Sequence, residues 1–175
     1  VTLNLTDANY DTTIANGSHI FPIFVGPVVG PSVTNTLTIS KIGAPSTFSY
    51  RGSPVVQGSF GIGGTGGLSG PADSEEPIMG VCSRYTTISN INLVSLGTTA
   101  NDVENGLMIF EAYGENMGKW YNTFDKITVN MDRNNINTKG IYSTSLSSPG
   151  GIQGTNSNNT FRDITIRDSH IGIYI

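Results

Sequence analysis

The stretch NTFDKITVN, Asn122 to Asn130, returns 37 residues later as NTFRDITIR, Asn159 to Arg167. In both copies apolar side chains alternate with polar ones, and an alternation of period two is typical of β-strands rather than helices. A related stretch, RYTTISNINLVSL, Arg84 to Leu96, precedes them. The repeat therefore predicts β-strands that recur along the chain.

The three copies superpose with their apolar positions in three rows, at steps of 36 and 37 residues. The rows are Ile88, Phe124 and Phe161; Ile91, Ile127 and Ile164; and Leu93, Val129 and Ile166. A Gly-Ile-type strand follows each copy, beginning at Gly106, Gly140 and Gly172. Strand-sized units that recur in this way, with length changes confined to polar gaps, predict a solenoid in which stacked units share one core.

The asparagine that opens each of the two closest copies has a structural interpretation. Asn122 and Asn159 stand at the same position of the repeat. We expect them to stack at a turn, where their side-chain amides bond from one unit to the next. A contact with a ligand is the alternative for the same side chains.

The composition agrees with an all-β fold. A chain of 175 residues that is 37% hydrophobic can build one core, and 22 Gly with only 13% charged residues favour short strands joined by turns. The net charge of −4, without a basic cluster, disfavours nucleic acid as a partner. No apolar run is long enough to span a bilayer, so membrane insertion is not expected.

We divide the chain into three segments. Residues 1–52 are predicted to form an irregular N-terminal capping β segment. Residues 53–77 are predicted to be a Gly-rich loop, because ordering so many glycines costs too much backbone entropy. Residues 78–175 hold the stacked units, and their apolar alternation runs to Ile175, so we expect the chain to be a fragment of a longer protein.

Cysteine and histidine give no sign of a metal or a cofactor. The single Cys82 has apolar neighbours and is predicted to be a buried thiol, so no intrachain disulfide is expected. His19 and His170 are far apart in the sequence, and no His/Cys/Asp cluster has metal-ligand spacing.

The copies NTFDKITV, NTFRDITI and ISNINLV, each followed by a Gly-Ile strand, resemble the coils of right-handed parallel β-helix proteins of the pectate-lyase-like superfamily. Among these, the trimeric tailspikes of bacteriophages are the most similar in style, and LTISKIGAPSTFSYRG, Leu37 to Gly52, resembles the stretch that leads into their first coils. The motifs that mark pectate lyases, polygalacturonases and pectin esterases are absent. The resemblance implies a homotrimer in a virion tail, in contact with other tail proteins, that binds and in some members depolymerises a bacterial surface polysaccharide.

Glycoside cleavage needs two carboxyl groups on either side of one bond, and aromatic rings offer flat apolar faces to sugars. Both kinds of residue meet in FEAYGENMGKWY, Phe110 to Tyr121, which interrupts the repeat. The candidate acid and base are Glu111, Glu115 and Asp132. The candidate glycan-binding residues are Tyr113, Lys119, Trp120 and Tyr121.

Each candidate has a structural alternative. Trp120 and Tyr121 can pack over the coil surface or a subunit interface, and Asp132, like Asp168, can form a turn at the end of a strand. Two other function classes stay open. One is a non-catalytic structural or adhesive virion protein, and the other is a secreted polysaccharide lyase in which Lys or Arg removes the proton next to a uronate carboxylate.

Overall fold

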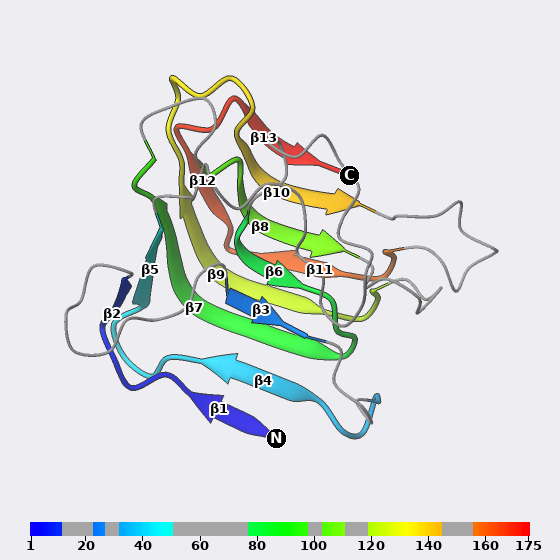
Figure 1. Cartoon of the computed structure of the whole chain (residues 1–175). Helices are drawn as coiled ribbons and strands as arrows, with labels where there is room; N and C mark the ends of the chain where they lie inside the picture. Colours follow the sequence, from blue (N-terminus) through cyan, green and yellow to red (C-terminus); the bar gives the residue numbers. More distant parts are fainter. Residues whose placement is uncertain (12–22, 27–31, 51–76, 98–102, 111–118, 145–155) are drawn as a thin grey trace, which may run out of the picture.

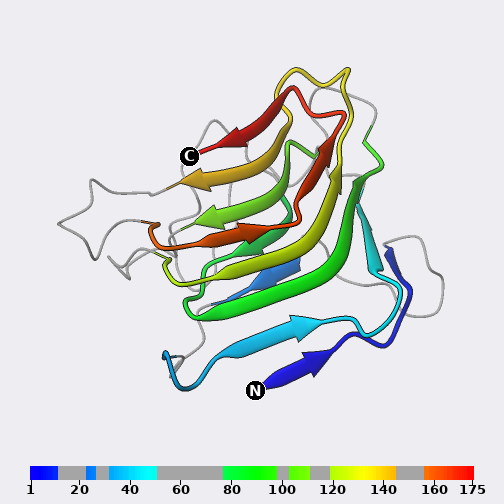
Figure 2. The same ribbon diagram turned by 180° about the vertical axis from the view of Figure 1, so that it is seen from behind.

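The computed structural model describes residues 1–11, 23–26, 32–50, 77–97, 103–110, 119–144 and 156–175. These residues form two sheets, and every pair of neighbouring strands in them is parallel (Figures 1 and 2). No helix occurs among them. The all-β fold class is therefore confirmed, with parallel strands as predicted.

The larger sheet, sheet A, has eight strands. They are β1 (Thr2–Asn4), β2 (Asn9–Asp11), β4 (Leu37–Ser40), β5 (Ser46–Tyr50), β7 (Thr86–Ser95), β9 (Thr123–Asn130), β11 (Thr160–Arg162) and β12 (Thr165–Arg167). Sheet B has five strands. They are β3 (Ile23–Val25), β6 (Pro77–Val81), β8 (Asn105–Phe110), β10 (Lys139–Thr144) and β13 (Ile171–Tyr174).

The chain visits the two sheets alternately, and each return adds a strand beside the previous one. Thus β6, β8, β10 and β13 lie side by side in sheet B, while the segments between them, β7, β9 and then β11 with β12, lie side by side in sheet A (Figure 1). Parallel strands need a long connection between them, and here the described part of each connection includes a strand of the other sheet.

The observed register confirms the alignment of the repeats. Ile88 lies opposite Phe124, and Phe124 lies opposite Phe161. Leu93 pairs in the same way with Val129, and Val129 with Ile166. These rows point into the space between the sheets, where they join one continuous core. Phe124 and Phe161 stack with ring centroids 5.2 Å apart.

The N-terminal segment continues the same rows. Leu3 pairs with Ile39, which pairs with Ile88. Where β2 pairs with β5, Tyr10 lies opposite Phe48, and the two rings stack with centroids 4.6 Å apart. Residues 1–11 and 37–50, which the sequence predicted to belong to an irregular capping β segment, therefore contribute strands to sheet A beside β7. The Gly-rich loop predicted at 53–77 lies outside the described residues, except that Pro77 begins β6.

The thiol of Cys82 is buried, as predicted. It belongs to a second, smaller apolar cluster with Met108 and Phe110, against which Phe24 and Tyr142 pack. Three of these side chains, Phe24, Met108 and Tyr142, stand in one register row across sheet B together with Gly80. Within the described residues, no helix is long and apolar enough to cross a membrane.

The long strands of sheet A bend part-way along their length, which Figures 1 and 2 show most clearly for β7 and β9. At the bend the backbone takes a left-handed conformation, with φ of 59° at Asn90, 54° at Lys126 and 52° at Asp163. Asn and Asp tolerate this conformation better than other side chains do. Asn90 also donates from Nδ2 to the carbonyl oxygens of Lys41 and Gly43, at 2.7 and 2.8 Å.

Lys126 is therefore the least suited residue of the three bends. We expect Lys126→Asn to raise the free energy of unfolding by about 0.5–1 kcal/mol, because the left-handed backbone is less unfavourable for Asn than for Lys. Urea denaturation of both proteins measures the change. The matched control is Thr128→Asn on the same strand, where the backbone is extended and Asn should lower stability slightly. Equal effects of the two substitutions would contradict this explanation.

Candidate functional site

Four aromatic and basic side chains gather where the chain enters β7 and β9. Arg84 and Tyr85 precede β7, and Trp120 and Tyr121 precede β9 at the equivalent positions 36 residues later. The turns lie side by side, since the amide of Tyr85 donates to the carbonyl oxygen of Trp120 at 3.3 Å. We call Arg84, Tyr85, Trp120 and Tyr121 the aromatic cluster.

The side chains of the aromatic cluster form two stacked pairs. The rings of Tyr85 and Tyr121 are nearly parallel, at 7°, with centroids 5.2 Å apart. The guanidinium carbon of Arg84 lies 5.0 Å from the centre of the Trp120 ring. Tyr121 is 52% exposed and the other three residues are partly exposed, so the cluster forms part of the molecular surface.

Buried asparagines hold the turns that carry this cluster. Asn122 is fully buried, accepts a hydrogen bond from the amide of Thr86 and donates one to the carbonyl oxygen of Ser83, both at 3.0 Å. One unit further on, Asn159 accepts from the amide of Asn122 at 3.0 Å and donates to the carbonyl oxygen of Lys119 at 2.9 Å. The expected bonding of the asparagine amides from unit to unit is confirmed.

The tyrosines of the aromatic cluster occupy a backbone position that does not suit them. The φ angles are 51° at Tyr85 and 57° at Tyr121, and Asn158 has 55° at the same position of the next unit. A left-handed backbone is unfavourable by roughly 1–2 kcal/mol for a residue with a Cβ, and less so for Asn than for Tyr. Asn158 thus shows which kind of residue the turn alone would favour.

The structure brings together only part of the predicted site. Trp120 and Tyr121 meet in the aromatic cluster. Lys119 is only 1% exposed, and its backbone amide donates to Oδ1 of Asn156 at 2.9 Å, so this residue is part of the packed turn rather than of the surface. Glu111, Tyr113 and Glu115 lie outside the described residues, so their roles stay predictions.

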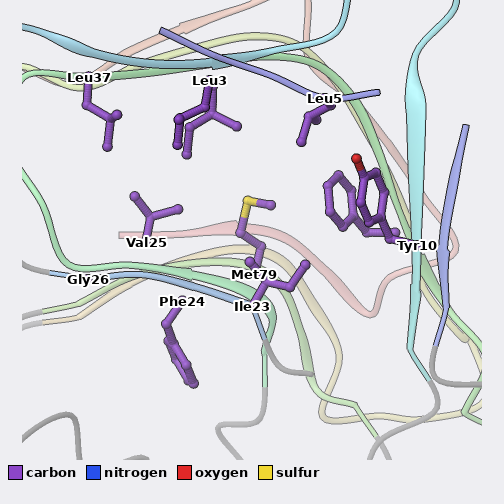
Figure 3. A pocket seen from close by; sticks show the side chains of 11 residues that line it. Leu3, Leu5, Tyr10, Ile23, Phe24, Val25, Gly26, Leu37 and Met79 are labelled. Atoms are coloured by element: carbon purple, nitrogen blue, oxygen red, sulfur yellow. The ribbon is translucent and has the colours of Figure 1, made fainter. Parts of the chain in front are cut away.

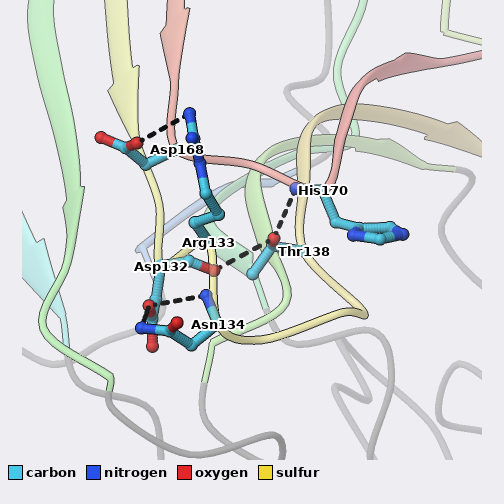
Figure 4. Close-up of polar contacts among 6 residues, drawn as sticks. All are labelled: Asp132, Arg133, Asn134, Thr138, Asp168 and His170. Carbon is cyan, nitrogen blue, oxygen red and sulfur yellow. Dashed lines mark hydrogen bonds and ion pairs between the residues drawn. The ribbon is translucent and has the colours of Figure 1, made fainter.

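Asp132 is engaged in the turn after β9 (Figure 4). Its Oδ1 accepts hydrogen bonds from the amide of Asn134 at 3.0 Å and from Nδ2 of the same residue at 3.1 Å. Its carbonyl oxygen accepts from the hydroxyl of Thr138 at 3.4 Å, and that hydroxyl in turn accepts from the amide of His170 at 2.9 Å. This arrangement favours the turn-forming interpretation of Asp132.

Two other acids of sheet A and its turns are paired with arginines. Asp168 lies 3.3 Å from Arg133 (Figure 4). Asp125 accepts a hydrogen bond from Nε of Arg162 at 2.8 Å, and this bond holds the pKa of Asp125 below its ordinary value. Both pairs join neighbouring units of the stack. A general acid needs a raised pKa, and the bond to Arg162 shifts the pKa of Asp125 in the opposite direction.

Sequence reasoning missed Arg84 and Tyr85 as members of the cluster. The signal was present, because the pair Arg84-Tyr85 aligns with Trp120-Tyr121 as soon as the repeats are superposed. The gap that contains Glu111 and Glu115 was predicted as the site instead, because it holds both carboxylates and aromatic rings. In the structure, stacking between neighbouring units identifies Tyr85 as the partner of Tyr121 and Arg84 as the partner of Trp120.

A second feature is an apolar pocket of about 460 Å³ at the N-terminal end of the core (Figure 3). Its lining comes from β1, β2, β4 and β5 on one side and from β3 and β6 on the other. Leu3, Leu5, Ile23 and Met79 point into it, and the hydroxyl of Tyr10 accepts from the amide of Asp7 at 3.3 Å. The pocket is the end of the core, where the inward rows face no further strand among the described residues.

In the part of the chain that the structure describes, no three His, Cys, Asp or Glu side chains gather as a metal site would require. No family model, curated protein or solved structure matches this chain.

Proposed function

We propose that the two sheets are faces of a right-handed parallel β-helix and that this chain binds carbohydrate through the aromatic cluster. The alternation between sheets and the in-register parallel pairing support the β-helix. A polysaccharide on a bacterial surface, bound by a trimeric tailspike of a virion, is the ligand and setting that the resemblance of the repeats supports.

The observation that carries the proposal is the stack of Tyr85 and Tyr121 on the surface turns that lead into β7 and β9. Aromatic rings present apolar faces to the C–H groups of a sugar, and the phenol hydroxyls can bond to its hydroxyl groups. The indole of Trp120 adds a third ring beside them. Asn158 and Thr160 are exposed at the start of the next unit, and uncharged donors and acceptors of this kind suit a neutral glycan.

Stacking of the two tyrosine rings adds little net stability to the folded protein. Stacking of two aromatic rings contributes about 0.5–1.5 kcal/mol. The left-handed backbone at each ring costs roughly 1–2 kcal/mol. One ring stack does not offset the left-handed backbone of two residues, so stacking as such does not explain Tyr at both positions, and binding of a ligand gives a reason for both.

Binding is better supported than cleavage. Of the three acids predicted from the sequence, Asp132 is engaged in a turn, which leaves Glu111 and Glu115 as the predicted acid and base. Depolymerisation therefore stays a prediction that rests on those two residues, and a purely adhesive protein is the alternative that the described residues favour.

We expect Tyr121→Asn to reduce binding by at least tenfold while the free energy of unfolding changes by less than about 1 kcal/mol. The substitution removes the most exposed ring but relieves the backbone cost. Binding can be measured by affinity electrophoresis in gels that contain bacterial capsular or O-antigen polysaccharides, and stability by urea denaturation.

The matched control is Tyr174→Asn. Tyr174 is also 52% exposed but lies on β13 of sheet B, so its loss should leave retention unchanged. The proposal fails if no polysaccharide of a broad panel retards the wild type, or if both variants are retarded as strongly as the wild type. Loss of stability without loss of retention in Tyr121→Asn would assign the stack a structural role.

A further inference from the structure

We infer that an uncharged sugar ring takes the third place in the tyrosine stack, on the face of Tyr121 that looks away from Tyr85 and toward Asn158. This inference rests on the proposed carbohydrate binding and adds the position and the chemical class of the bound sugar.

The repeat defines the third place. Thr160 pairs with Thr123, so Asn158 stands one unit beyond Tyr121 as Tyr121 stands one unit beyond Tyr85. All three residues share the same left-handed backbone, with φ between 51° and 57°. A tyrosine at position 158 would therefore continue the stack, and the shorter Asn158 leaves room for a ring from outside.

Exposure favours this end of the stack. Tyr121 is 52% exposed, whereas Tyr85 is only partly exposed. On the far side of Tyr85, the amide of Leu37 donates to the carbonyl oxygen of Tyr85 at 3.2 Å, so the chain of the preceding unit lies against that turn. A ring that joins the stack thus has access at Tyr121.

The polar groups around the third place are uncharged. Asn158 donates from Nδ2 to the hydroxyl of Ser157 at 3.4 Å, and the carbonyl oxygen of Ser157 accepts from the amide of Tyr121 at 3.4 Å. Thr160 is exposed in the same unit. Amides and hydroxyls can both donate to and accept from sugar hydroxyls. Of the charged residues on the adjoining strands β9 and β11, Asp125 and Arg162 bond to each other at 2.8 Å, and the exposed Lys126 stands further along β9 at the bend.

The decisive variants change position 158. Asn158→Tyr should fill the third place with a protein ring and lower affinity at least tenfold for the neutral polysaccharides that the wild type retains. Asn158→Gly leaves the place open on a backbone that glycine adopts freely but removes the side-chain amide, so it should lower affinity less than Asn158→Tyr does. Both variants are measured by affinity electrophoresis, beside Tyr121→Asn and with circular dichroism as the check on folding.

A measurement on the wild type covers the case in which Asn158→Tyr does not fold. Nitration of tyrosines by tetranitromethane, read by mass spectrometry, should be suppressed at Tyr121 when a retained polysaccharide is present. Nitration at Tyr85 should change much less, because Tyr121 already covers one face of that ring.

The outcomes separate the inference from the proposed function. Retention that is lost in Tyr121→Asn but unchanged or increased in a folded Asn158→Tyr would overturn the third-place inference and leave carbohydrate binding intact. Stronger protection of Tyr85 than of Tyr121, or a preference for uronic-acid polymers over neutral ones, would also overturn it. If the wild type binds no polysaccharide of the panel, the proposed function fails and the inference fails with it.

Discussion

Gly106→Ala is expected to lower the free energy of unfolding by about 3 kcal/mol, a large fraction of the stability of an ordinary domain. A Cβ at Gly106 would clash with Cγ1 of Val129 and would lie 2.7 Å from the carbonyl oxygen of Gly140. The first contact is with a buried side chain of sheet A and the second is with the backbone of the next strand. Neither neighbour can move without disturbing the stack, and urea denaturation measures the loss.

The same glycine row supplies the controls. Gly140 is equally confined, by the side chain of Ile166 and by the carbonyl oxygen of Gly172 at 2.7 Å, so Gly140→Ala should cost a similar amount. A Cβ at Gly172 meets nothing within 4 Å, so Gly172→Ala should change stability by less than about 0.5 kcal/mol. Equal stability of the three variants would contradict the register in which β8, β10 and β13 lie side by side.

Asn122→Ala is expected to cost about 3 kcal/mol, because it removes two hydrogen bonds and leaves two buried backbone groups without their partner. The two groups are the amide of Thr86 and the carbonyl oxygen of Ser83. Asn122→Asp should be at least as harmful, since the carboxylate cannot donate to Ser83 and would bury a charge. Thermal and urea denaturation of the variants give the comparison.

The control is Asn92→Ala, on the outer side of the same sheet. Asn92 is partly exposed, and its Nδ2 donates to the hydroxyl of Thr47 at 3.3 Å. Water can replace that bond, so the loss should stay below about 1 kcal/mol. A loss for Asn122→Ala as small as that for Asn92→Ala would show that the asparagines do not hold the turns.

The repeat made the central part of the fold predictable from the sequence. The rows that contain Phe124 and Val129 were aligned from their period alone, and the observed pairing places the same residues opposite each other. This succeeds because parallel in-register pairing puts equivalent residues of successive units side by side, so a sequence period becomes a spatial row.

The N-terminal units were harder to recognise because their spacing is irregular. The step is 36 residues from Thr2 to Thr38 but 49 from Leu37 to Thr86. The bend also differs, since residues 41–45 separate β4 from β5 where β7 has the single residue Asn90. Unequal lengths at both places hide the period, although the inward residues of the N-terminal strands, such as Ile39, follow the same pattern.

The candidate site was predictable only in part. Trp120 and Tyr121 were selected by their chemistry, but their partners Arg84 and Tyr85 depend on contact between neighbouring units. The burial of Lys119 and the turn around Asp132 depend on local packing, which periodicity does not reveal.

The most direct test of carbohydrate binding is a nuclear Overhauser measurement between a polysaccharide retained by the wild type and tyrosine rings labelled with isotope. Sugar C–H protons should give cross-peaks to the ring of Tyr121, assigned by their disappearance in Tyr121→Asn. Binding with no cross-peak to Tyr121 would contradict carbohydrate binding by the aromatic cluster, because the glycan would then lie on another part of the protein.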